Sequence, residues 1–140
     1  MANIVLLSCV KKKSPHKSKA RDLYISTLFR YSLRYAEQII KPDKICILSA
    51  KHGLLNLDKI IEPYEETLNN KKREEQRFWA KKVFAQIEKE CDVKNDTFIF
   101  LTGKKYNQDL SLYLPHIQLP LKNLTQGKRV QWLKQKLEGV

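Results

Sequence analysis

The side chains best suited to chemistry lie in three polar segments, each of which follows an apolar run. In chain order, these candidates are Ser8, Cys9, Lys11, Lys12, Arg21, Ser49, Lys51, His52, Glu62, Tyr64, Gly103 and Tyr106. Hydroxyl groups and cations suit phosphate, because hydrogen bonds and opposite charge both stabilise that anion. A histidine and a carboxylate add the means for proton transfer. The set therefore predicts a site for a phosphate-bearing substrate with acid–base groups beside it.

The first segment, SCVKKKSPHKSKARDLY, offers several donors to a phosphate directly after a strand-like run. Its predicted phosphate ligands are Ser8, Lys11, Lys12 and Arg21. Arg21 is either such a ligand or an anchor for the segment. Cys9 is either a nucleophile activated by the neighbouring cations or a small buried residue at the end of a strand. Neither the phosphate-loop nor the dinucleotide glycine fingerprint occurs in the sequence.

The second segment, SAKHGLLNLDKIIEPYE, supplies the two candidate catalytic groups. Glu62 precedes Pro63, which restricts it to an extended conformation. This carboxylate either stabilises a developing cation or positions water, or it simply pairs with Lys51 or Arg21. His52 either transfers a proton near neutral pH or hydrogen-bonds the backbone around it. Both alternatives stay open for both residues.

Binding is the predicted role of the remaining candidates. Ser49 and Lys51 directly follow a strand-like run and are expected to bind phosphate. Tyr64 either stacks on a base or lies in the core with its hydroxyl satisfied. Gly103 either presents backbone N–H groups to an anion or belongs to an ordinary strand-to-helix turn. Tyr106 follows three residues later and is a second candidate for stacking on a base.

No motif in the sequence is typical of a metal or cofactor site. The three histidines lack ligand spacing, and Cys9, Cys46 and Cys91 are far apart and form no CxxC pair. We therefore expect no catalytic metal, no cofactor and no disulfide scaffold.

A sheet must position these segments, because each one follows a run typical of a buried strand. The runs are Asn3–Val10, Lys44–Ser49 and Thr97–Thr102, and helical patterns separate them. Strands that are apolar along their whole length indicate a parallel sheet covered on both faces. We predict a single three-layer α/β domain over residues 1–140, with a mostly parallel sheet of about four strands that includes a short one at Ile117–Leu119. Ligands of such sheets bind at the carboxyl ends of the strands, where all three segments begin.

Apolar periodicity and capping signals place the remaining elements. One predicted helix is capped by Ser26, has Ile39 as the last residue of its apolar face and ends before Pro42. The other predicted helices cover Glu74–Cys91, Lys105–Leu114 and Val130–Leu137. The segments Lys11–Lys19 and His52–Glu66 are predicted to be loops. Phe78 and Trp79 are assigned to the core rather than to a base-stacking surface.

Charge makes a polyanion the expected partner. The 140 residues include 27 Lys+Arg and 15 Asp+Glu, a formal net charge of +12. Residues 1–30 contribute +6 of this excess and residues 122–140 contribute +4, which favours a basic patch over a uniformly cationic surface. The alternative is a charged surface that serves only solubility. A hydrophobic share of 42% excludes a disordered polybasic tail.

No stretch approaches the roughly 18 apolar residues of a membrane span. The N-terminal apolar run is also too short for the core of a signal peptide. We therefore expect a cytoplasmic protein without a membrane partner.

The ordered motifs SCVKKK, ARDLY, LSAKHGLL, IEPYE, LTGKKY and LPLKNLTQGKR resemble those of an uncharacterised bacterial and phage domain family of unknown function. Its members are labelled YaaA-like, after the peroxide-stress protein YaaA. The resemblance spans Val5 to about Leu133. It implies DNA binding and protection from oxidative DNA damage. It also implies a distant kinship with the uracil-DNA-glycosylase-like α/β fold and with base-modification enzymes.

The leading functional hypothesis is an enzyme-like domain that cleaves or exchanges the N-glycosidic bond of a nucleobase in nucleic acid or a nucleotide. Glu62 would stabilise the cationic transition state or position water, His52 would donate a hydrogen bond to the departing base, and a tyrosine would stack on it. This hypothesis expects Ser8, Arg21, His52 and Glu62 to converge on one pocket. The alternatives are a non-catalytic module that binds DNA or RNA through its basic surface, and a protein-interaction domain.

Overall fold

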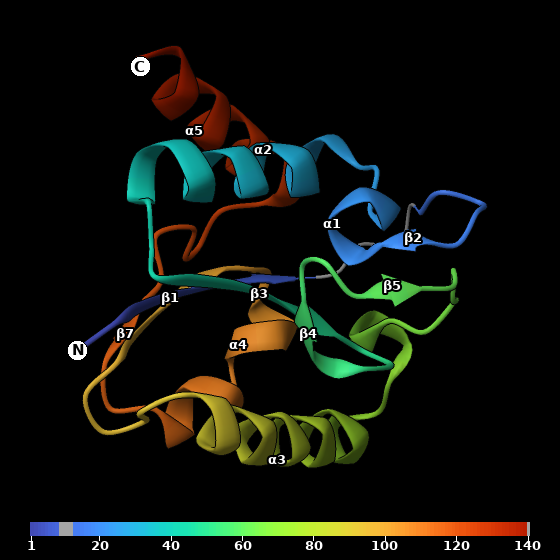
Figure 1. Cartoon of the computed structure of the whole chain (residues 1–140), viewed down its shortest axis with the longest axis vertical. Coiled ribbons are helices and arrows are strands. Elements are labelled where there is room, and N and C mark those ends of the chain that lie inside the picture. Colours follow the sequence, from blue (N-terminus) through green and yellow to red (C-terminus); the bar gives the residue numbers. More distant parts are fainter. Residues whose placement is uncertain (9–12, 140) are drawn as a thin grey trace.

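The computed structural model describes residues 1–8 and 13–139, and a five-stranded sheet forms its centre (Figure 1). The strands of this sheet are β1 (Asn3–Ser8), β3 (Lys44–Ser49), β4 (Gly53–Asn56), β6 (Thr97–Leu101) and β7 (Ile117–Gln118). Their spatial order is β4-β3-β1-β6-β7. All neighbours pair in parallel except β3 and β4, which are antiparallel. The predicted α/β architecture with a mostly parallel sheet is confirmed, with one strand more than expected.

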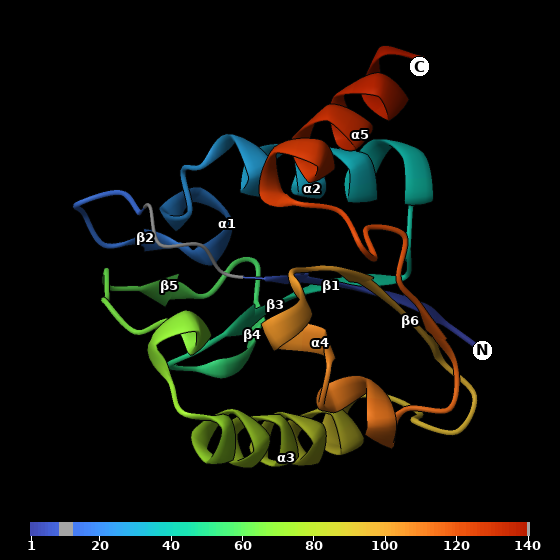
Figure 2. The same cartoon turned by 180° about the vertical axis from the view of Figure 1, so that it is seen from behind.

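Helices cover both faces of the sheet, as Figures 1 and 2 show. The helical elements are α1 (Ala20–Leu23), α2 (Thr27–Tyr35), the π-helical turn η1 (Ala36–Ile40), the 3-10 turn η2 (Leu68–Asn70), α3 (Arg73–Glu90), α4 (Lys104–Asn107), the 3-10 turn η3 (Leu110–Tyr113) and α5 (Gln126–Glu138). One face carries α2 and α5, which pack against each other, and the other carries α3 and α4. The central strand β1 is therefore buried on both sides, and Val5, Leu6 and Leu7 are fully buried. Burying one such side chain contributes about 2 kcal/mol.

The helix after Ser26 begins where the sequence predicts, since the Ser26 hydroxyl accepts the backbone N–H of Phe29 at 3.1 Å. It does not run to Ile39 as a regular α-helix. The α-helical part ends at Tyr35, and η1 then continues the helix as one wider turn. Lys41 closes this turn in the left-handed conformation, with φ of 50°. The chain then enters β3.

The segment His52–Glu66 is not the long loop that its sequence indicated. Gly53, whose φ is +73°, lets the chain turn directly into β4, which pairs with β3. Further on, β5 (Ile60–Ile61) pairs with β2 (Ser18–Lys19) in a separate two-stranded sheet, so Lys11–Lys19 is not entirely a loop either. These strands are only two to four residues long, too short to leave a clear alternating pattern in the sequence.

Two further predictions are corrected. The segment Lys105–Leu114 is not one helix, because α4 and η3 divide it. Trp79 is buried as expected, but Phe78 is 71% exposed and does not belong to the core. Adjacent residues of a helix point about 100° apart, so only one of the two can face the sheet. None of the helices in the described ranges is long and apolar enough to cross a membrane.

Candidate functional site

A cleft of about 630 Å³ lies where β1 and β6 end and α5 begins. Its lining residues are Ser8, Leu28, Thr67, Asn69, Gly103, Lys104, Lys105, Tyr106, Gln126 and Arg129. Three of these side chains are cationic and none is acidic. Hydroxyl and carboxamide groups supply further hydrogen bonds. Such a lining favours an anionic ligand.

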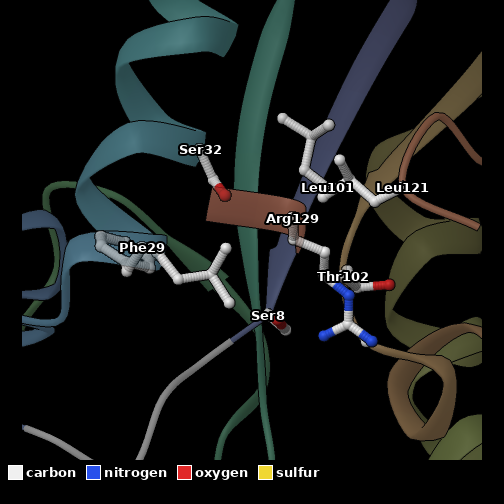
Figure 3. Close-up of a pocket in the computed structure, with 9 residues that line it drawn as sticks. Ser8, Phe29, Ser32, Leu101, Thr102, Leu121 and Arg129 are labelled. Atoms are coloured by element: carbon white, nitrogen blue, oxygen red, sulfur yellow. The ribbon is translucent and has the colours of Figure 1, made fainter. Parts of the chain in front are cut away.

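Arg129 occupies the centre of this region. It lies in the first turns of α5, whose capping residue Thr125 accepts the backbone N–H of Lys128. Figure 3 shows its side chain extending toward Ser8 and Thr102, beside a small pocket with room for about one water molecule. The Nε atom of Arg129 is buried and has no hydrogen-bond partner in the described part of the chain. An unsatisfied buried donor costs about 1–3 kcal/mol unless a water molecule or a ligand accepts from it.

Gly103 lets the arginine approach the end of β6 closely. A Cβ atom built on Gly103 would lie 3.2 Å from Nη1 of Arg129, which is tighter than ordinary contact. A side chain at this position would therefore push the guanidinium away. The sequence left open whether Gly103 offers backbone N–H groups to an anion or belongs to an ordinary strand-to-helix turn, and the structure adds a steric reason for a glycine here.

A second hollow, of about 440 Å³, is also bordered by Arg129. We call it the side hollow. It is lined by Thr102, Lys104, Asn107, Gln108, Ser111, Leu119, Leu121, Lys122, Asn123, Leu124 and Arg129. Lys104 and Arg129 line both the cleft and the side hollow. The same two cations therefore face two adjoining spaces.

Three buried hydroxyl groups form a separate cluster, made of Tyr24, Ser49 and Tyr64 and called here the hydroxyl cluster. The Tyr64 hydroxyl lies 2.5 Å from that of Tyr24 and 2.7 Å from that of Ser49. The Ser49 oxygen also accepts the backbone N–H groups of Lys51, at 3.3 Å, and His52, at 3.0 Å. The hydroxyl cluster thus ties the end of β3 to two segments distant in sequence.

His52 lies beside the hydroxyl cluster, with its ring edge-on to Tyr64 at a centroid distance of 5.4 Å. Burial and the nearby cations Lys51 and Lys59 lower the pKa of His52 from its ordinary value. The imidazole is therefore neutral near pH 7 and has both a donor and an acceptor nitrogen. The Lys13 ammonium lies over the Tyr64 ring, with Nζ 4.5 Å from the ring centroid.

The predicted site residues divide between these regions. Ser8, Gly103 and Tyr106 line the cleft, whereas Ser49, Lys51, His52 and Tyr64 belong to the hydroxyl cluster or border it. Cys9, Lys11 and Lys12 lie outside the described residues.

The remaining two lie elsewhere. The Arg21 guanidinium donates to both carboxylate oxygens of Glu37, at 2.9 and 3.1 Å, and this hydrogen bonding raises the pKa of Arg21. Glu62 is exposed. None of the described hollows is lined by more than one of Ser8, Arg21, His52 and Glu62.

Sequence reasoning did not identify Lys104 or Lys105 as candidate ligands, and for Arg129 it offered only a weak signal, a helix N-terminus in which two cations follow Gly127. The signal available was the basic excess of residues 122–140 and the two lysines after Gly103. Neither signal shows that α5 begins beside the ends of β1 and β6, because that contact joins residues distant in sequence.

All the histidines, aspartates and glutamates and two of the three cysteines lie in the described ranges. Within them, no three His, Cys, Asp or Glu side chains gather closely enough to hold a metal ion. Cys46 and Cys91 are free thiols, and burial raises the pKa of Cys46 to about 11. Cys46 is therefore protonated near pH 7, and a protonated thiol is a poor nucleophile.

No curated protein and no solved structure shows significant similarity to this chain. A family profile does match, over residues 4–135, and its description is a family of unknown function (DUF6884). The match includes every described residue of the cleft and of the hydroxyl cluster. This chain therefore belongs to the DUF6884 family of unknown function.

Proposed function

We propose that this protein binds nucleic acid or nucleotides and holds a phosphate in the cleft beside Arg129. The observation that carries the proposal is the cleft's lining of three cations without an acidic side chain, with a buried Arg129 Nε that lacks a partner among the described residues. A guanidinium presents several N–H donors in one plane and suits the oxygens of a phosphate. Ser8, Lys104 and Lys105 add a hydroxyl and two positive charges.

Size and overall charge support the same proposal. The cleft, at about 630 Å³, falls within the range of about 300–1,000 Å³ that is common for ligand sites. A net charge of +12 favours partners with many phosphates, because binding releases their condensed counterions. A cytoplasmic location, where nucleic acids and nucleotides are abundant, is part of this proposal.

The test is a binding measurement with a charge-matched control. Fluorescence anisotropy with labelled single-stranded and duplex oligonucleotides should show affinity that falls steeply with salt. Arg129→Gln should weaken binding at least about tenfold. Arg77→Gln makes the same change at an exposed arginine of α3 outside the cleft and should have little effect. Equal affinity of the two variants would overturn the proposal.

A narrower candidate is cleavage or exchange of the N-glycosidic bond of a nucleobase. The resemblance to YaaA-like proteins and the kinship it implies with base-modification enzymes suggest this chemistry. The observation that favours it is His52, whose neutral imidazole beside the hydroxyl cluster has a hydrogen-bond donor for a departing base. Glu62 would provide the carboxylate. This candidate ranks second, because none of the described hollows is lined by His52 or Glu62.

An assay of released base tests this second candidate function directly. Oligonucleotides with uracil, hypoxanthine or oxidised bases are incubated with the protein, and free base is detected by chromatography. Catalysis predicts release that Glu62→Gln abolishes while oligonucleotide binding persists. If the protein releases no base, or if Glu62→Gln releases as much as the native chain, the catalytic candidate fails and the binding proposal stands.

A further inference from the structure

We propose that the side hollow is a nucleobase pocket, so that the protein binds one nucleotide unit by its phosphate and its base together. This inference rests on the proposed function, because it places the phosphate on Arg129. The supporting geometry is that Lys104 and Arg129 line both the cleft and the side hollow. A phosphate bound by these two cations has the side hollow directly beside it.

The side hollow, like the cleft, is lined by three cations, here Lys104, Lys122 and Arg129, but it also contains three leucines. Leu119, Leu121 and Leu124 provide apolar surface, and Asn107 and Gln108 provide carboxamides. A nucleobase needs this combination, because its faces are apolar and its edges carry hydrogen-bonding groups. Apolar lining with a few placed polar groups is the general pattern of small-ligand pockets. A bare phosphate would gain nothing from the leucines.

Asn107 is oriented in advance for such a ligand. Its Nδ2 donates to the Thr102 hydroxyl at 3.0 Å and to the Gly103 carbonyl at 3.2 Å. The amide nitrogen is therefore engaged, and Oδ1 remains an acceptor without a hydrogen bond from the described residues. Gln108 is similar, since its Nε2 donates to Oε1 of Gln76 at 3.3 Å. Carboxamide oxygens accept from the amino and ring N–H groups on base edges.

The remaining volume fits this assignment. The side hollow, at about 440 Å³, is large enough for a small ligand, and the cleft beyond Arg129 leaves further space for a connected strand. The cations line the boundary between the two spaces, where a phosphate joins one nucleoside to the next. The predicted ligand class is thus a nucleotide, free or at one position of a single strand with an unpaired base.

The experiment separates the contribution of the base from that of the phosphate. Calorimetric titrations of the full chain use the four nucleoside 5′-monophosphates, ribose 5-phosphate and inorganic phosphate. At least one nucleotide should bind about tenfold more tightly than ribose 5-phosphate. If ribose 5-phosphate binds as tightly as every nucleotide, the base pocket is refuted and the proposed function stands. If none of these probes binds, and oligonucleotides do not bind either, both proposals fail.

A variant that fills the side hollow gives the second readout. Leu119→Trp should reduce nucleotide affinity to that of ribose 5-phosphate and leave the affinity for ribose 5-phosphate unchanged. Leu112→Trp is the matched control, because Leu112 is 82% exposed and lines neither space. If the bulky variant does not fold, Leu119→Ala should lower nucleotide affinity in the same selective way. Unchanged nucleotide affinity in a folded Leu119 variant would overturn the inference.

Discussion

The hydroxyl cluster and the cleft are both polar regions near the carboxyl ends of parallel strands, yet they differ in where their hydrogen bonds go. Tyr24, Ser49 and Tyr64 bond to one another within the protein interior. Arg129 instead borders an open space, and its buried Nε has no partner in the described ranges. Buried polar groups that hydrogen-bond to one another stabilise a fold. Polar groups that border a cavity and lack such partners remain available to hydrogen-bond a ligand. This contrast is the basis for proposing that the cleft binds a ligand and that the hydroxyl cluster stabilises the fold.

The largest predicted effect is a loss of folding stability when the hydroxyl cluster is disrupted. Tyr64→Phe removes the hydroxyl that joins Tyr24 to Ser49 and leaves buried oxygens with fewer partners. We expect the free energy of unfolding to fall by about 2–3 kcal/mol, measured by urea denaturation. Oligonucleotide affinity should stay unchanged. Tyr113→Phe, at a 40% exposed tyrosine, is the control with little expected effect. Weakened binding without a loss of stability would place Tyr64 in the binding site instead.

The reverse pattern is expected for Arg129→Gln. Binding should weaken at least about tenfold, which corresponds to about 1.4 kcal/mol. The free energy of unfolding should not fall, because the native guanidinium forms no ion pair with the described residues and its Nε is unsatisfied. Parallel anisotropy and urea measurements on one preparation separate the two quantities. A large loss of stability would show that the arginine serves the fold.

A smaller effect is expected from Gly103→Ala. The new Cβ would lie 3.2 Å from Nη1 of Arg129 and shift the guanidinium by a few tenths of an ångström. We expect phosphate affinity to fall about threefold, which is about 0.7 kcal/mol. Gly127→Ala is a matched control, since a Cβ there meets nothing within 4 Å. This control lies in α5 and should leave binding unchanged while stabilising the helix by about 0.5–1 kcal/mol.

The smallest predicted effect is the contribution of His52 to the pH dependence of folding stability. The folded state lowers the pKa of His52 below the unfolded value of 6.5, chiefly through burial and the charges of Lys51 and Lys59. The unfolded chain therefore binds more protons at His52, and this residue lowers stability as the pH falls through 6.5 toward the folded pKa. Urea midpoints at about pH 8 and about pH 5 should differ less for His52→Gln than for the native protein. If the stability of His52→Gln depends on pH in the same way as that of the native protein, His52 does not contribute to the pH dependence.

Much of the fold could be predicted because local patterns reflect burial. Continuous apolar runs mark β1, β3 and β6, which helices cover on both faces. Helix α3 was predicted to within one residue at each end, because eighteen residues leave a clear apolar period. The short strands β4 and β5 were missed, since two to four residues leave no clear pattern: β4 pairs with the preceding β3 across a tight turn, and β5 pairs with the distant β2.

The candidate site was predictable only in part. Ser8, Gly103 and Tyr106 were selected because each lies at or just after the end of a parallel strand, and all three line the cleft. The same rule also selected Ser49 and Tyr64, whose hydroxyl groups bond to each other instead. Position at a strand end therefore marks where a ligand can bind, but not whether a polar group there is already satisfied.

The amino-acid sequence alone was enough to predict the α/β class and the parallel strands, and it shows the basic excess directly. These properties follow from composition and short-range periodicity, which any segment carries within itself. Tertiary packing was needed to bring Arg129 of α5 against Gly103 at the end of β6. It also joined Tyr24, Ser49 and Tyr64 across 40 residues of chain. Both depend on contacts between residues far apart in the chain, and no local pattern encodes the partner of such a contact.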